Sequence, residues 1–175
     1  MSQTGDRLQT KVAEFQKVFD DSFAAPEQSE RVAVEQMLAI KVGNDRFAVS
    51  LRDISGLTVA KGTILPVPSS VPELLGITGI RGVVVPIFNL AALLNIEPGM
   101  AQYRWLILCG GRRATIALAV DLVEGHLEIS ADELIAHGTT ATANYIKQTV
   151  RDGDILRGVI DLGLLVEKIR AKGRT

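Results

Sequence analysis

Apolar residues recur at every second position along much of the chain from residue 36 onward, which is the period of half-buried β-strands. The first such run covers residues 38–42, and a second run at 47–51 follows the turn Gly43-Asn44-Asp45. This arrangement predicts a β-hairpin. A second hairpin is predicted where Gly110-Gly111 separates the runs 106–109 and 114–120. Further short strands are predicted at 64–67, 77–81, 83–88, 145–150 and 155–160, with Asp152-Gly153 as a hairpin turn.

The chain before residue 36 has a helical period instead. Five apolar residues spaced by three or four positions share one helix face: Leu8, Val12, Phe15, Phe19 and Phe23. We therefore predict an amphipathic helix followed by a charged tether over residues 1–35. The apolar face suits packing on the protein's own body or on a partner helix. A membrane surface is the least favoured of the three, because the polar face is not rich in Lys and Arg.

Only short helices are predicted after residue 36. Asn89 is placed to cap a helix at 90–94, Ser130-Ala131-Asp132-Glu133 matches a capping box, and residues 162–171 predict a C-terminal helix. Many short strands with glycine-rich turns and few helices predict an all-β fold, either a barrel or a sandwich.

An approximate internal repeat indicates two similar small barrels. Gly43 in the first hairpin matches Gly110 in the second. Arg81-Gly82-Val83 matches Arg157-Gly158-Val159, in the same order along the chain and with nearly the same spacing. We expect one domain over 36–172, with two barrel subdomains at roughly 36–98 and 102–162, either consecutive or interleaved, followed by the C-terminal helix.

Composition narrows the classes of function. The chain has 175 residues and a net charge of -1, so it lacks the basic excess of proteins that neutralise phosphates. The barrels keep few aromatic residues for base stacking, and most of these fall on inward-facing positions, so nucleic-acid binding is not expected. The longest uncharged run, residues 83–96, is shorter than the about 20 residues of a membrane span. With no apolar signal segment near the start, we expect a soluble cytoplasmic protein.

Candidate catalytic groups are isolated from one another. His126 and His137 have no nucleophile motif nearby, and Asp152 and Asp154 flank a turn glycine rather than forming a metal site. The single cysteine, Cys109, ends an apolar strand and is expected to be a buried, inert thiol that excludes a disulfide framework. We therefore expect neither an enzyme nor a bound cofactor or metal.

Arg81 is the exception within the glycine-rich stretch 76–82. This stretch lacks the lysine and hydroxyl residue of a phosphate-binding loop, so its glycines are better explained as bulges or tight bends. A guanidinium on a rigid turn is either solvated surface or an anchor for a protein–protein contact.

Taken together, residues 36–169 resemble the CheW-like coupling proteins of bacterial chemotaxis. The segment 76–90, GITGIRGVVVPIFNL, is similar to the family's G-V-x-N-L-R-G followed by hydrophobic residues, a proline and an acid with leucine. The segment 119–125, AVDLVEG, is similar to its V-D-x-V-x-G strand. Residues 155–165 and 47–54 are similar to its closing strand and helix and to its second strand. This chain departs from the family at Gly79-Ile80, which replaces Asn-Leu, and at Asn89, which replaces the acid.

The resemblance implies an all-β scaffold of two five-stranded SH3-like barrels. It also implies a non-enzymatic adaptor that joins the regulatory domain of a CheA-type histidine kinase to the cytoplasmic tip of methyl-accepting chemoreceptors, in chemotaxis or a related motility pathway, without inserting into the membrane. Arg81 and Gly82 match the family's receptor-contacting arginine and glycine, and Gly76 and Ile54 match neighbouring groove positions. The alternative is a double β-barrel that binds a small ligand or an oligonucleotide, for which one concave pocket with converging polar groups is expected.

Overall fold

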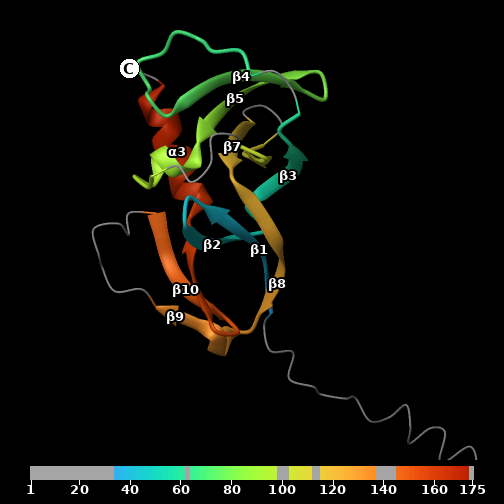
Figure 1. The fold of residues 1–175 in the computed structure, drawn as a ribbon, viewed down its shortest axis with the longest axis vertical. Coiled ribbons are helices and arrows are strands. Elements are labelled where there is room, and N and C mark those ends of the chain that lie inside the picture. Colours follow the sequence, from blue (N-terminus) through green and yellow to red (C-terminus); the bar gives the residue numbers. More distant parts are fainter. Residues whose placement is uncertain (1–33, 62–63, 98–102, 112–114, 137–144, 174–175) are drawn as a thin grey trace, which may run out of the picture. The chain divides into compact units, whose positions relative to one another are not determined.

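The computed structural model describes residues 34–61, 64–97, 103–111, 115–136 and 145–173 (Figure 1). All of them belong to one unit of the chain, Ala33–Thr175. The predicted N-terminal helix lies outside the described residues, and the first strand begins at Glu35, the last residue of the predicted tether. The described chain is mostly β, as predicted, and forms two sheets.

The first sheet has six strands in the order β8-β1-β2-β11-β10-β9. Its neighbours are antiparallel except β11 and β2, which are parallel. The β1–β2 hairpin turns at Gly43, as the alternating pattern predicts. The strands are β1 (Glu35–Val42), β2 (Asp45–Ser50), β8 (Leu122–Ile129), β9 (Leu134–Ala136), β10 (Ile146–Asp152) and β11 (Ile155–Ile160).

The second sheet has five strands in the order β3-β6-β7-β5-β4. It repeats the pattern of the first: two antiparallel hairpins, β4–β5 and β6–β7, are joined by the parallel pair β5 and β7, and β3 pairs with β6. The strands are β3 (Ile54–Val59), β4 (Leu74–Ile80), β5 (Val83–Asn89), β6 (Trp105–Cys109) and β7 (Ile116–Val120).

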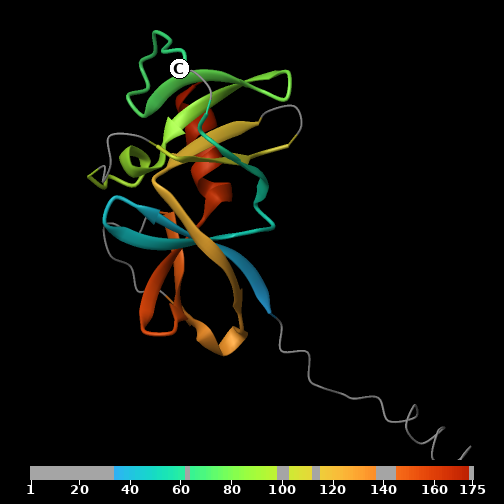
Figure 2. The ribbon, with the colours of Figure 1, turned by 45° about the vertical axis from the view of Figure 1, so that its right-hand side comes forward.

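The two sheets are interleaved in the sequence, so the boundaries 36–98 and 102–162 do not separate them. The first sheet takes strands from residues 35–50 and 122–160, and the second takes the segment between them (Figure 2). The chain crosses from the second sheet to the first at Asp121, between β7 and β8. The first sheet also exceeds the expected five strands, because the short β9 adds to the edge of β10.

The structure contains the predicted internal repeat, but one of the two predicted sequence matches does not join structurally equivalent residues. Gly43 and Gly110 both follow the first strand of a hairpin and both have positive φ. The counterpart of the Arg81-Gly82 turn is Gly153-Asp154, the turn between β10 and β11. Arg157 instead lies inside β11, so the repeated Arg-Gly-Val letters are not structurally equivalent.

Three apolar clusters of the described residues hold the fold together. One draws on all six strands of the first sheet, which therefore curls around its own core: Met37, Ala48, Ile129, Val150 and Val159, with Leu127 and Leu134 against them. A second lies within the other sheet: Val85, Ile87, Leu106, Leu108, Ala117 and Ala119. The largest joins the two sheets and includes the opposite faces of β6 and β7, so those strands are buried on both sides.

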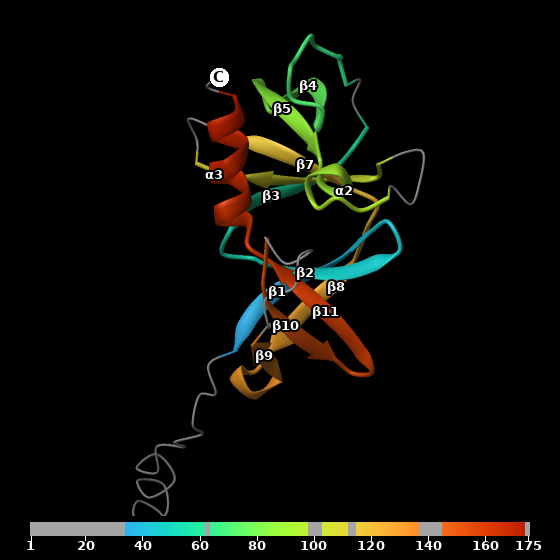
Figure 3. The ribbon, with the colours of Figure 1, turned by 90° about the vertical axis from the view of Figure 1, so that its left-hand side faces the viewer.

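Two helices complete this shared core (Figure 3). Asn89 caps α2 (Leu90–Leu93) by accepting a hydrogen bond from the Ala92 N–H, as predicted. Asp161 caps α3 (Leu162–Lys172) in the same way, and each cap lies at the end of the second strand of a repeated hairpin, Asn89 as the last residue of β5 and Asp161 directly after β11. The predicted helix after Ser130 is a single 3₁₀ turn, η1 (Ala131–Glu133), in which the Ser130 N–H donates to Glu133 Oε2.

The strand predictions failed where pairing is irregular. Residues 64–67 form no strand, only a single bridge between Leu65 and Ile77. Strands β3, β8 and β9 were not predicted from the hydrophobic periodicity. For β8 a usable signal was present, because from residue 123 the polar side chains of Glu124, His126 and Glu128 face outward and alternate with more buried residues up to Ile129.

Candidate functional site

Arg81 occupies a strained position at the tip of the β4–β5 hairpin. Ile80 pairs with Val83, so Arg81 and Gly82 form a two-residue turn. Their φ angles are 51° and 78°, the positive values of a type I′ turn, which favours Asn, Asp or Gly at both positions. An arginine in this conformation costs conformational energy and indicates a role for the side chain.

The tip of the hairpin is exposed and partly apolar. Arg81 and Gly82 are both exposed, and Arg81 forms no ion pair with any described residue. The next two residues, Val83 and Val84, have 53% and 68% of their surface exposed. Pro86 lies opposite Ile77 in the hairpin, and its fixed φ helps to hold β5 extended. Arginine is enriched in protein–protein interfaces, and the exposed valines beside it add apolar surface that a partner could cover.

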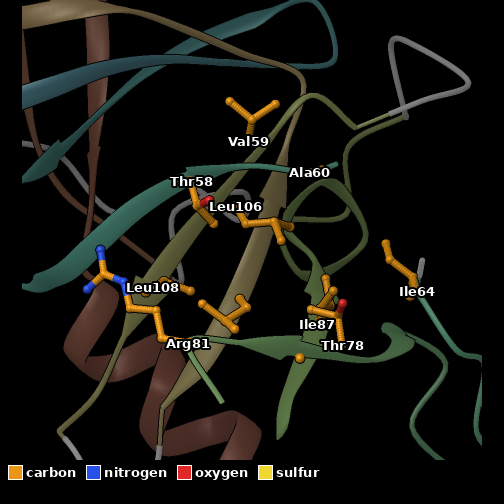
Figure 4. Close-up of a pocket in the computed structure, with 11 residues that line it drawn as sticks. Thr58, Val59, Ala60, Ile64, Thr78, Arg81, Ile87, Leu106 and Leu108 are labelled. Atoms are coloured by element: carbon orange, nitrogen blue, oxygen red, sulfur yellow. The ribbon is translucent and has the colours of Figure 1, made fainter. Parts of the chain in front are cut away.

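A groove of about 270 Å³ lies beside this tip, between β3 and β4 (Figure 4). Thr58, Val59 and Ala60 form one wall, and Thr78, Gly79 and Ile80 form the other. Its floor is apolar and belongs to the core of the second sheet: Ile87, Leu106 and Leu108. Arg81 borders it at one end and Ile64 at the other. The groove is smaller than the about 300–1,000 Å³ typical of small-molecule sites.

Gly76 shapes the hairpin from beneath the surface. It is buried, at a bulge in the β4–β5 register, and has φ 145°. A Cβ built there would lie 2.2 Å from the carbonyl oxygen of Leu65, because Leu65 and Ile77 exchange two backbone hydrogen bonds of 2.9 Å. Only glycine fits this close approach.

Ile54, the other predicted site residue, starts β3 and is half-buried. It pairs with Cys109 and packs against the core shared by the two sheets. Neither Ile54 nor Gly76 is among the groove residues. The structure therefore joins Arg81 and Gly82 in one exposed turn, keeps Gly76 behind them in β4, and puts Ile54 on the other strand that borders the groove.

A partly buried polar cluster lies near the residue at which the chain changes sheets. Asn89, besides capping α2, donates a 2.7 Å hydrogen bond from Nδ2 to the Tyr103 hydroxyl. Burial and, secondarily, the negative charge of Asp121 raise the pKa of Tyr103. Asp121 itself is 4% exposed and accepts a hydrogen bond from the Gly43 N–H. These groups are engaged in structural bonds.

The first sheet contains an ionic cluster that the sequence analysis did not anticipate. Arg157 is 4% exposed and pairs with Asp152 and Glu124, and Glu124 also contacts the more exposed Arg46. Strands β1 and β2 lie between β8 and β11 in the sheet order, so the Glu124–Arg157 pair bridges non-neighbouring strands of the curled sheet.

Among the described residues, the remaining reactive groups show no catalytic arrangement. Cys109 is buried, as predicted, and burial, with a smaller effect of Asp53, raises the pKa of its thiol to about 12. His126 is exposed in β8, whereas His137 lies outside the described residues. Across the described ranges, no three His, Cys, Asp or Glu side chains converge as a metal site requires.

Two curled sheets share a core and present an exposed cationic hairpin, which is the arrangement of a binding scaffold. Comparison with known proteins identifies the family. Residues 36–170 match the model of the CheW-like domain. The chain is 32% identical over 120 residues to a probable chemotaxis protein CheW of Rhizobium etli, covering 66% of this chain and 74% of that protein. It is 24% identical over 138 residues to the chemotaxis protein CheW of Thermotoga maritima, covering 78% and 91% of the two chains.

The fold has a counterpart among solved structures. The scaffolding protein TtCheW from Thermoanaerobacter tengcongensis matches with a TM-score of 0.67 at 16% identity, over 75% of this chain and 92% of that one. The chain belongs to the CheW-like family and is a non-catalytic adaptor of chemotaxis. The family couples chemoreceptors to the CheA kinase. In the part of the chain that the structure describes, no helix is long and apolar enough to cross a membrane.

Proposed function

We propose that this chain joins the cytoplasmic tip of a methyl-accepting chemoreceptor to the regulatory domain of a CheA-type histidine kinase, and that it does so in the cytoplasm. The observation that carries the receptor half of the proposal is the conformation of Arg81. An exposed arginine is held at a turn position that favours glycine or asparagine, which fits a side chain retained for contact with a partner.

The receptor site in this proposal is the β4–β5 hairpin tip. Arg81 supplies a fixed charge and a planar fork that can bind a carboxylate through two hydrogen bonds. Gly82 keeps the second turn position free of a side chain. Gly76 and Ile54 contribute by positioning β4 and β3, because the first is buried and the second is half-buried.

In this proposal the kinase binds exposed apolar side chains that occur at equivalent positions of the two sheets. Leu65 and Val84 are exposed on the second sheet, and Ile135 and Leu156 are exposed at the corresponding positions of the first. Leu65 and Ile135 are held by equivalent backbone pairings: Leu65 pairs with Ile77 of β4, and Ile135 pairs with Thr149 of β10. Because a contact centred on these side chains buries mainly apolar surface, its affinity should depend only weakly on salt.

The test compares Arg81→Glu with the wild-type chain for binding to a chemoreceptor fragment and to the kinase regulatory domain. Charge reversal at an interface anchor should weaken receptor binding by about 2 kcal/mol or more and leave kinase binding unchanged. Arg151→Glu, on the corresponding strand of the first sheet, is the matched control. Equal receptor binding by Arg81→Glu and wild type would remove Arg81 from the receptor site.

A further inference from the structure

The groove beside Arg81 is lined in part by Ile80, whose counterpart in the first sheet belongs to the ionic cluster, although the two sheets share a strand pattern. When the turn Arg81-Gly82 is aligned with Gly153-Asp154, Asp152 and Arg157 correspond to Ile80 and Val85. In the first sheet these positions carry the ionic cluster that bridges from β11 to Glu124 of β8. In the second sheet the corresponding side chains are apolar, and the gap between β3 and β4 holds the groove.

The same gap exposes a strand edge. Ile77 directs its N–H and C=O away from β5, toward Leu65. Backbone groups two residues apart in a strand face the same side, so those of Gly79 also point away from β5, toward the groove. In the first sheet β9 covers the corresponding edge over three residue pairs, whereas the second sheet has the single Leu65–Ile77 bridge. Among the described strands, no other pairs with β4 on this side.

We propose that the groove binds a short extended peptide segment of a partner protein, with one apolar side chain seated on Ile87, Leu106 and Leu108 and an acidic side chain near Arg81. Three properties of the groove select this occupant. Its apolar floor takes an aliphatic or aromatic side chain. Its exposed edge at Gly79 takes backbone hydrogen bonds, as in strand addition to a sheet. Arg81, the one charged residue among the described residues that line the groove, selects a carboxylate.

The size of the groove argues against a helix. A space of about 270 Å³ holds one or two apolar side chains, whereas a helix with its side chains is about 10 Å across and requires a wider trough. An apolar residue and an acid two positions apart lie on the same side of an extended segment, so both can reach the groove at once. The proposal goes beyond the receptor contact, because it concerns the groove behind Arg81 and does not require that the segment come from a receptor.

The experiment is a selection from a random octapeptide library displayed on phage, with the full chain as bait. Thr58→Phe, which fills the groove from the β3 wall, is the blocked bait. We expect wild-type bait to enrich peptides with an apolar residue two positions from Asp or Glu, and the blocked bait to lose them. A synthetic peptide of the enriched sequence should bind Arg81→Gln at least tenfold more weakly than wild type, and Arg151→Gln equally well. Amide exchange at Gly79 should slow at least tenfold when that peptide is bound.

Three results would overturn the proposal. The first is enrichment of the same peptides on the blocked bait, and the second is a lack of any groove-dependent peptide. The third is a consensus spaced by three or four residues, which indicates a helical occupant. If Thr58→Phe does not fold, as judged by its amide spectrum, the paired Arg81→Gln and Arg151→Gln affinities and the exchange rate of Gly79 decide the question.

Discussion

The backbone N–H of Gly43 donates a buried hydrogen bond of 2.6 Å to Oδ2 of Asp121. Gly43 turns the β1–β2 hairpin of the first sheet, and Asp121 is the residue at which the chain leaves the second sheet for the first. The contact at Gly43 is also tight, since a Cβ there would lie 2.5 Å from the Glu97 carbonyl oxygen. This pair therefore fixes the hairpin against the crossover between the sheets.

Replacing Asp121 should destabilise the fold, because the Gly43 N–H would remain buried without an acceptor. We expect Asp121→Ala to lower the free energy of unfolding by about 1–3 kcal/mol. Asp121→Asn should cost less, since its amide oxygen can still accept the bond. Urea unfolding measures both variants, with Asp154→Ala in an exposed turn as the control. A midpoint for Asp121→Ala equal to that of the control would contradict this role.

Two glycines of the same strand should differ sharply in their tolerance of alanine. Gly76→Ala places a Cβ against the Leu65 carbonyl at a positive φ, and should cost at least about 2 kcal/mol. Gly79→Ala meets nothing within 4 Å, and should change stability by no more than about 0.5 kcal/mol. Thermal unfolding of the two variants checks the contrast, and equal losses would show that the close approach at Gly76 is unimportant.

The turn conformation of Arg81 makes stability and binding change in opposite directions. Arg81→Asn should stabilise the chain by about 1 kcal/mol, because asparagine tolerates the positive φ, while receptor binding is lost. Arg81→Ala should lose binding without a comparable gain in stability, since alanine meets the same steric penalty. Unfolding midpoints and receptor-fragment affinity separate these effects. If Arg81→Ala were stabilised as much as Arg81→Asn, the gain in stability would come from loss of the charge and not from relief of the positive φ.

The contribution of the ionic cluster to the free energy of unfolding should depend mainly on Arg157, its buried member. Arg157→Ala leaves Glu124 and Asp152 without their shared cation, and should cost about 3–5 kcal/mol. Arg46→Ala removes a half-exposed partner of Glu124, and should cost less than about 1 kcal/mol. Denaturant unfolding at low and high salt measures both variants. Similar losses would mean that the cluster behaves as surface charge.

The Cys109 thiol should be unreactive while the chain is folded. Its pKa is raised from 9.0 to about 12, so it stays protonated at pH 8, and its burial blocks access. Because the unfolded chain loses this proton at lower pH than the folded chain, the stabilising contribution of the protonated thiol should fade from about pH 9 toward pH 12. Labelling with an aromatic disulfide reagent should require denaturant, and Cys109→Ala should flatten the alkaline decline in stability. Rapid labelling of the native chain would disprove the burial.

Local chemistry determined much of what could be predicted. The predicted runs located both strands of four hairpins, β1–β2, β4–β5, β6–β7 and β10–β11. Asn89 was correctly assigned as a helix cap, and Cys109 was correctly assigned as buried. These features depend on residues close together in the sequence, where periodicity, capping and turn chemistry act directly. The same local signals identified Arg81 as a cation on a turn, and its neighbourhood carried the resemblance to the family.

Tertiary structure decided which segments meet. The parallel pairs β2–β11 and β5–β7 interleave the two sheets, and no local pattern specifies a partner that lies near the other end of the chain, as β11 does for β2. Burial of β6 and β7 on both faces likewise follows from the second layer that covers them. Arg81 and Arg157 share the same local letters, yet one is an exposed turn residue and the other a buried ion-pair partner. Strand register puts the first at the tip of its hairpin and the second inside a curled sheet, so side-chain environment is a property of the assembled fold.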